Sequence, residues 1–99
     1  MKKFTILIPI FNDWESLEKL LSEINNNIKN IKETQFNCVV IDDCSTIKNL
    51  RIKIPPQINL IKIIHMAKNK GHARCNALGI KYLSKNIDFD YLILMDGDG

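Results

Sequence analysis

The stretch that decides the fold is Tyr91-Leu92-Ile93-Leu94-Met95-Asp96-Gly97-Asp98, a short apolar run followed by two aspartates one residue apart. An apolar run of this length bounded by polar residues predicts a buried strand. Such a strand brings Asp96 and Asp98 to its carboxyl end, the edge at which open parallel sheets bind ligands. Two carboxylates this close favour a site for Mg²⁺ or Mn²⁺, and an ordinary Asp-Gly turn is the structural alternative.

Three more strands and two helices are expected ahead of this stretch. The strands are predicted over residues 4–8, 36–41 and 60–64, with Pro9 ending the first because proline cannot continue a central ladder. A helix near residues 14–27 is predicted, with Asn12 and Glu15 spaced as a capping box. Its apolar stripe is Trp14, Leu17, Leu21, Ile24, Ile28 and Ile31. A second helix follows Gly71 and is expected to bury Ala73, Ala77, Ile80 and Leu83.

This order of elements predicts an α/β fold and a single domain over residues 1–99. We expect a Rossmann-like three-layer α/β/α arrangement around a mostly parallel four-stranded sheet in the order 3-2-1-4. All strand ends then share one edge, and the second helix points its N-terminus there, where it would favour an anion. The fourth strand would form an apolar sheet edge, which predicts association with a second copy of the chain.

Composition excludes several classes of protein. The net charge is only +3 and no dense basic run appears, so nucleic acid is not an expected partner. The three cysteines form no CxxC pair, which argues against a disulfide framework or a zinc site and suits the cytoplasm. The apolar run after Lys2 and Lys3 contains Pro9 and lacks a small-residue cleavage site, so we interpret it as a strand rather than a signal peptide.

Several side chains at the predicted edge could together hold a nucleoside diphosphate. Phe11 offers a flat face for a base, and Asp43 could accept the imide N–H of uracil. Ser45 is either a second polar contact or a brace for its turn, and Arg74 could pair with phosphate or a base carbonyl. Structural alternatives remain for each: Phe11 could cover the core, and Arg74 could be a solvated helix residue.

Four motifs then resemble the nucleotide-sugar-binding, N-terminal half of a family 2 glycosyltransferase with the GT-A fold. They lie at residues 5–12 (TILIPIFN), 40–46 (VIDDCST), 69–79 (NKGHARCNALG) and 94–98 (LMDGD). Their order and spacing fit the family across nearly the whole chain. Two positions depart from the family pattern: Phe11 stands where tyrosine is frequent, and Ile47 where an acidic residue is common.

The resemblance implies a donor site for a nucleotide-diphosphate sugar, with UDP as the expected nucleotide. The implied substrate-binding residues are Pro9, Phe11, Asp42, Asp43, Ser45, Arg74 and Asp96. Asp96 and Asp98 would bind Mn²⁺ or Mg²⁺. The family's catalytic base, which deprotonates the acceptor hydroxyl for inverting transfer, is expected beyond Gly99. The resemblance also implies a cytoplasmic enzyme whose full-length form associates with the membrane surface.

Three other functions share features of this pattern. A non-catalytic nucleotide-binding or assembly module with the same fold remains an alternative, because no residue of the chain can be assigned as the catalytic base. A signalling receiver would carry its acidic pair after the first strand, where this chain has Pro9 and Phe11. A nucleotidyltransferase would need a glycine-rich phosphate loop there, and that loop is absent.

Overall fold

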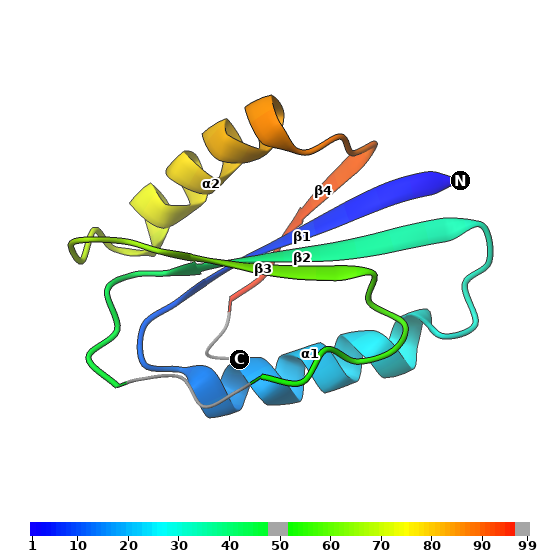
Figure 1. The fold of residues 1–99 in the computed structure, drawn as a ribbon, viewed down its shortest axis with the longest axis horizontal. Coiled ribbons are helices and arrows are strands. Elements are labelled where there is room, and N and C mark those ends of the chain that lie inside the picture. Colours follow the sequence, from blue (N-terminus) through cyan, green and yellow to red (C-terminus); the bar gives the residue numbers. More distant parts are fainter. Residues whose placement is uncertain (48–51, 97–99) are drawn as a thin grey trace.

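A computed structural model describes residues 1–47 and 52–96 of the chain. Strands and helices alternate as the sequence predicts, with two strands in succession after the first helix (Figure 1). The elements are β1 (Lys2–Ile10), α1 (Trp14–Ile28), β2 (Thr34–Asp42), β3 (Leu60–His65), α2 (His72–Asn86) and β4 (Tyr91–Leu94). Neither helix in the described part of the chain is long and apolar enough to cross a bilayer.

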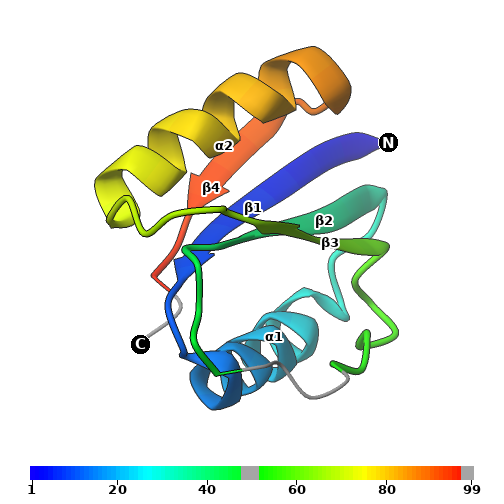
Figure 2. The same cartoon turned by 60° about the vertical axis from the view of Figure 1, so that its left-hand side comes forward.

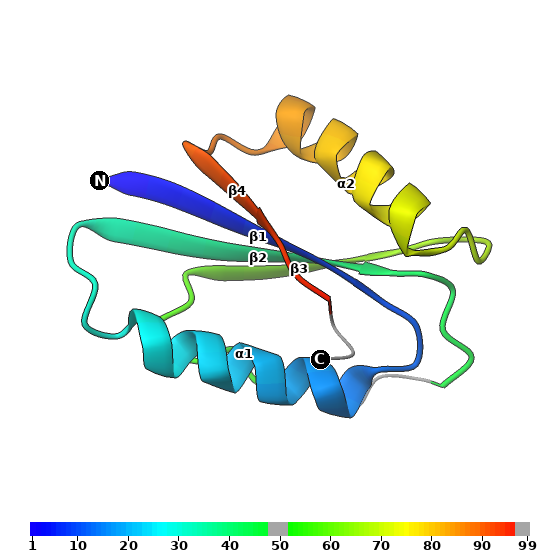
Figure 3. The same ribbon diagram turned by 180° about the vertical axis from the view of Figure 1, so that it is seen from behind.

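The strands form one sheet in the order β3-β2-β1-β4, and every neighbouring pair is parallel. The helices lie on opposite faces of this sheet, α1 on one and α2 on the other (Figures 1 and 2). Figure 3, seen from behind, shows β4 as the outer strand beside β1. The predicted three-layer α/β/α fold and strand order are therefore confirmed, and the carboxyl ends of the strands share one edge.

The stripe predicted on the first helix is confirmed along the length of α1. The side chains that it buries are Trp14, Leu17, Leu21, Ile24 and Ile28. They pack against alternate residues of β1 and β2, such as Ile8 and Val40, in the larger of the two cores. Ile31 is 49% exposed, contrary to the prediction, because it follows the end of α1. The expected capping box is also absent, since no side chain caps α1.

The second helix buries a different face from the one predicted. Only Leu83 of the expected set is buried, and three residues are exposed instead: Ala73, Ala77 and Ile80. α2 turns Cys75 and Gly79 toward the sheet. A Cβ atom at Gly79 would lie 2.7 Å from Leu7 Cδ1, so the missing side chain is what lets the helix approach β1. This close approach fixes which face of α2 is buried.

Pro9 lies inside β1, so the prediction that it ends the strand is wrong. Within a parallel ladder, the N–H and C=O of one residue face the same neighbour, and successive residues alternate between neighbours. Leu7 O accepts a hydrogen bond from Met95 N, so Leu7 faces β4, and Pro9, two residues on, faces the same way. Proline has no N–H to continue that ladder. β1 therefore keeps its pairing with β2, while pairing with β4 stops at Leu7 and Leu94, just before Asp96.

Candidate functional site

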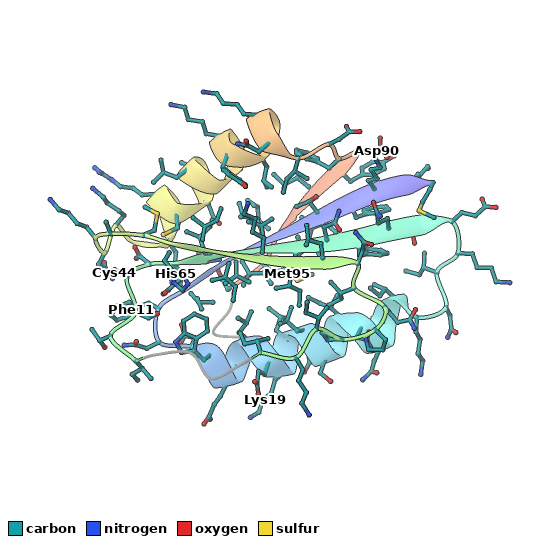
Figure 4. The ribbon with its side chains drawn as sticks, in the orientation of Figure 1. Phe11, Lys19, Cys44, His65, Asp90 and Met95 are labelled. Atoms are coloured by element: carbon teal, nitrogen blue, oxygen red, sulfur yellow. The ribbon has the colours of Figure 1, made fainter. Side chains whose placement is uncertain are left out.

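The carboxyl edge of the sheet collects the loops that follow β1, β2 and β3. Phe11, Cys44 and His65, which come from these three strand ends, lie together at that end of the molecule (Figure 4). Backbone hydrogen bonds join the strand ends: Asp43 N donates to Ile10 O, and Met66 N donates to Asp42 O, both at 2.8 Å. The edge is thus a connected structure rather than a set of independent loops.

Asp42 holds the turn after β2 and the end of β3. Its side chain is buried, and Oδ1 accepts hydrogen bonds from the backbone N–H (3.0 Å) and the hydroxyl of Ser45. Its Oδ2 lies 2.7 Å from Nδ1 of His65. Because a carboxylate only accepts, Nδ1 carries the proton, and both Asp42 oxygens are engaged. A partner for His65 could not be predicted from the sequence. The register of β2 and β3 is what places His65 beside Asp42.

Asp43 is directed at the segment that begins α2. Its side chain is 1% exposed, and its two oxygens accept hydrogen bonds from Lys70 N (2.6 Å) and Gly71 N (2.8 Å). Gly71 has φ of +85°, a conformation that glycine adopts without the cost that a side chain brings. The anion expected at the start of α2 is therefore the protein's own carboxylate. Asp43 organises the edge, and its oxygens do not face solvent.

The pKa values of Asp43 and Cys75 follow from this arrangement. Burial on its own would raise the pKa of Asp43, but hydrogen bonds from Lys70, Gly71 and Cys75 and the charge of His72 outweigh it. The pKa of the Asp43 carboxyl therefore lies below its ordinary value of 3.8. Burial, followed by the neighbouring carboxylate, raises the pKa of the Cys75 thiol to about 11. Asp43 is ionised and Cys75 is a protonated donor at neutral pH.

Asn12 connects the loop after β1 to the loop after β2. Its backbone N–H donates to Ser45 Oγ at 2.9 Å, and its side-chain Nδ2 donates to Thr46 Oγ1 at 3.0 Å. Its Oδ1 accepts from Ile47 N at 2.9 Å. The indole Nε1 of Trp14 then donates to Ile47 O, also at 2.9 Å. We call residues 11–14 together with 45–47 the clasp.

From the sequence, Asn12 is expected to cap the first helix. Its φ of +60° excludes that role and identifies it instead as a turn residue in the left-handed region. Asparagine is one of the few residues with a side chain that enter this region readily, which is the one signal that the sequence offered. Ser45 acts as a brace in this structure, the second of the two roles predicted for it.

The remaining predicted site residues differ in how exposed they are. Phe11 is 37% exposed, so part of its surface is open to a ligand while the larger part is covered by the protein. Arg74 is exposed on the first turn of α2, and Asp96 is exposed directly after β4. Pro9 is buried within β1. Phe11, Arg74 and Asp96 thus offer side chains to a ligand, whereas Pro9 does not.

A metal site cannot be assembled from the described residues alone. Within residues 1–47 and 52–96, no group of three or more His, Cys, Asp or Glu side chains could hold an ion. Asp96 supplies one carboxylate there, and the predicted second ligand, Asp98, lies outside the described residues.

An open depression lies over the start of α1 and is partly formed by the clasp. It is lined by Asn12, Asp13, Trp14, Glu15, Ser16, Glu18 and Ile47. Three of these side chains are carboxylates, which would repel a diphosphate. The depression is therefore a poor candidate for a phosphorylated ligand, and the carboxyl edge of the sheet is the better one.

The parallel sheet, its flanking helices and its polar carboxyl edge define a Rossmann-like α/β protein. The sequence profile of Glycosyl transferase family 2 matches residues 5–99, and the chain belongs to that family. The resemblance found in the sequence motifs is confirmed, and the fold agrees with the GT-A type.

Individual members of the family are similar to parts of the chain. Poly(ribitol-phosphate) beta-N-acetylglucosaminyltransferase TarS of Staphylococcus aureus is 35% identical over 72% of this chain and 12% of its own. Poly(ribitol-phosphate) beta-N-acetylglucosaminyltransferase TarP of the same species is 28% identical over 99% of this chain and 29% of its own. Dolichol-phosphate mannosyltransferase of Pyrococcus furiosus is 30% identical over 97% of this chain and 26% of its own. The chain thus spans less than a third of the length of these relatives.

Proposed function

We propose that residues 1–99 form the donor-binding domain of a glycosyltransferase that takes a nucleotide-diphosphate sugar, with UDP as the nucleotide. The observation that carries the proposal is the exposed Phe11 within the hydrogen-bonded clasp, at the edge to which the start of α2 also belongs. An aromatic face fixed at a strand end suits a nucleobase. In the full protein, an acceptor hydroxyl would displace the diphosphate with inversion.

The site residues take distinct roles in this proposal. Phe11 stacks on the base, and Arg74, exposed one turn into α2, pairs with phosphate or a base carbonyl. Asp42 and Ser45 brace the loops, as their hydrogen bonds support. Asp43 fixes the start of α2, so a direct bond from Asp43 to the base would need the turn at Lys70 to move. Pro9 acts through its backbone.

We also propose that Asp96 and Asp98 bind the ribose and a divalent cation, Mn²⁺ or Mg²⁺. The exposure of Asp96, at the point where β4 leaves the sheet, supports this role. A bound cation would neutralise charge on the departing diphosphate.

Titration of the chain with UDP, with and without Mn²⁺, tests the donor site and the cation together. We expect UDP to bind and Mn²⁺ to tighten binding about tenfold, roughly 1.4 kcal/mol. The substitution Asp98→Ala should remove the effect of Mn²⁺, while Asp88→Ala, 89% exposed at the side chain and outside the site, should leave it unchanged. If UDP does not bind, with or without Asp98, the donor-site proposal is wrong.

A further titration and an activity assay address what the relatives leave open. The names of these relatives include transfer of both N-acetylglucosamine and mannose, so GDP should be titrated beside UDP. A donor-hydrolysis assay separates an active domain from a module that only binds nucleotide.

The dolichol phosphate in the name of one relative supports association of the full protein with a membrane surface, at the cytoplasmic face. The free thiols of Cys38, Cys44 and Cys75 suit that compartment.

We propose that the chain pairs with a second copy through β4. Among the described residues this strand pairs with β1 on one side and with no strand on the other, and Tyr91 and Leu94 are 48% and 50% exposed. Sedimentation velocity of this chain should show a dimer that dissociates on dilution. The substitution Leu94→Lys should favour the monomer, because a charge at an exposed edge opposes pairing. A monomer at every concentration would contradict the proposal.

A further inference from the structure

The clasp joins two loops that are 33 to 35 residues apart in sequence. Asn12 makes three of its hydrogen bonds, one through its backbone and two through its side chain. The acceptor of the backbone bond, Ser45 Oγ, is itself bonded to the buried carboxylate of Asp42. The loop after β1 is therefore attached through Asn12 to the rigid end of β2.

The backbone of Asn12 also sets the course of the chain at Phe11. Its φ of +60° reverses the chain between the end of β1 and the start of α1. Phe11 is the residue immediately before it, and its own backbone N–H has only a long contact, 3.4 Å, to Asp13 Oδ2. The backbone at Phe11 is thus followed directly by a residue whose conformation and hydrogen bonds are fixed.

We propose that Asn12 is a positioning residue for the donor nucleotide, because it holds the Phe11 ring in place before the base arrives. The proposal rests on the donor site proposed above. A loop that is already ordered loses less conformational freedom when ligand binds, so its hydrogen bonds contribute to affinity without touching the ligand.

The substitution Asn12→Gly isolates the side chain. Glycine adopts the same positive φ, so the turn is retained, while both side-chain hydrogen bonds of Asn12 are lost. We expect UDP to bind about tenfold more weakly to this variant, because the ring must be ordered on binding. The matched control is Asn30→Gly, an exposed asparagine in the turn after α1, which should bind UDP as the wild type does.

Trp14 reports whether the clasp has opened. It is the single tryptophan of the chain, it is 8% exposed, and its indole bonds to Ile47 O within the clasp. Asn12→Gly should shift its emission to longer wavelength, since Ile47 loses the bond that holds it to Asn12. The same measurement on Asn30→Gly should show no shift.

A double-mutant cycle with Phe11→Ala separates positioning from general weakening of the fold. If Asn12 acts through the Phe11 ring, Asn12→Gly should change UDP affinity less than twofold once the ring is absent. Equal tenfold losses with and without the ring would overturn the proposal. So would wild-type affinity in Asn12→Gly. Failure of the wild type to bind UDP would instead overturn the donor site itself, and this inference with it.

Discussion

Replacing Asp43 with alanine is expected to lower the free energy of unfolding by about 3 kcal/mol, measured by urea denaturation at pH 7. The carboxylate is 1% exposed and accepts the backbone N–H groups of Lys70 and Gly71. Alanine would remove the charged acceptor of both N–H groups, and a hydrogen bond to a charged group contributes about 1.5–3 kcal/mol. The control is Asp88→Ala, whose side chain is 89% exposed, and it should change stability little.

The contribution of Asp43 to the free energy of unfolding should decrease at low pH. The pKa of Asp43 is lowered in the folded chain, so its stabilising effect is present above the pKa of the unfolded state, near 3.8. It is lost as pH falls through the lower pKa of the folded state. Protonated Asp43 resembles asparagine, so the stability difference between wild type and Asp43→Asn should shrink in urea denaturation below about pH 4. A difference that stays constant from pH 7 to pH 2 would contradict this role.

The arrangement of the sheet could be predicted because it follows from local patterns. Continuous apolar runs and a helical stripe such as that of Trp14 and Leu17 are properties of neighbouring residues. The predictions for Pro9 and for the buried face of the second helix were wrong because each depends on a partner across the fold. Pro9 costs β1 no hydrogen bond with β2, since its nitrogen faces the side where β4 stops. The buried face of α2 follows from the approach of Gly79 to Leu7, which the spacing of apolar residues does not reveal.

The candidate site also has features that the sequence predicts and features that it does not. The motif order brought Asp42 and Asp43 to the correct edge, because strand ends of a parallel sheet must meet there. The hydrogen-bond partners of the two carboxylates could not be predicted. Asp42 is bonded to His65 across the register of β2 and β3, and Asp43 accepts from residues 27 and 28 positions further along the chain. The adjacent acidic pair thus serves two different loops, although its members look equivalent in sequence.

Replacing Phe11 with alanine is expected to weaken UDP binding by about 10- to 100-fold, measured by calorimetry. Stacking of a base on an aromatic side chain is worth roughly 1–3 kcal/mol by alanine substitution. Phe11 is 37% exposed, so its loss should lower the urea midpoint less than Asp43→Ala does. This combination distinguishes Phe11 from Asp43, whose loss should reduce stability first and affinity as a consequence.

Two comparisons make the effect of Phe11 specific to its ring. Phe11→Tyr retains the aromatic face and should bind UDP within about threefold of wild type, whereas Phe11→Leu retains apolar bulk and should lose most of the affinity. The loss in Phe11→Ala should be equal with and without Mn²⁺, because the base and the diphosphate occupy different parts of the donor. If Phe11→Leu binds as tightly as wild type, the ring does not stack on the base. If the loss appears only with Mn²⁺, Phe11 acts on the diphosphate end instead.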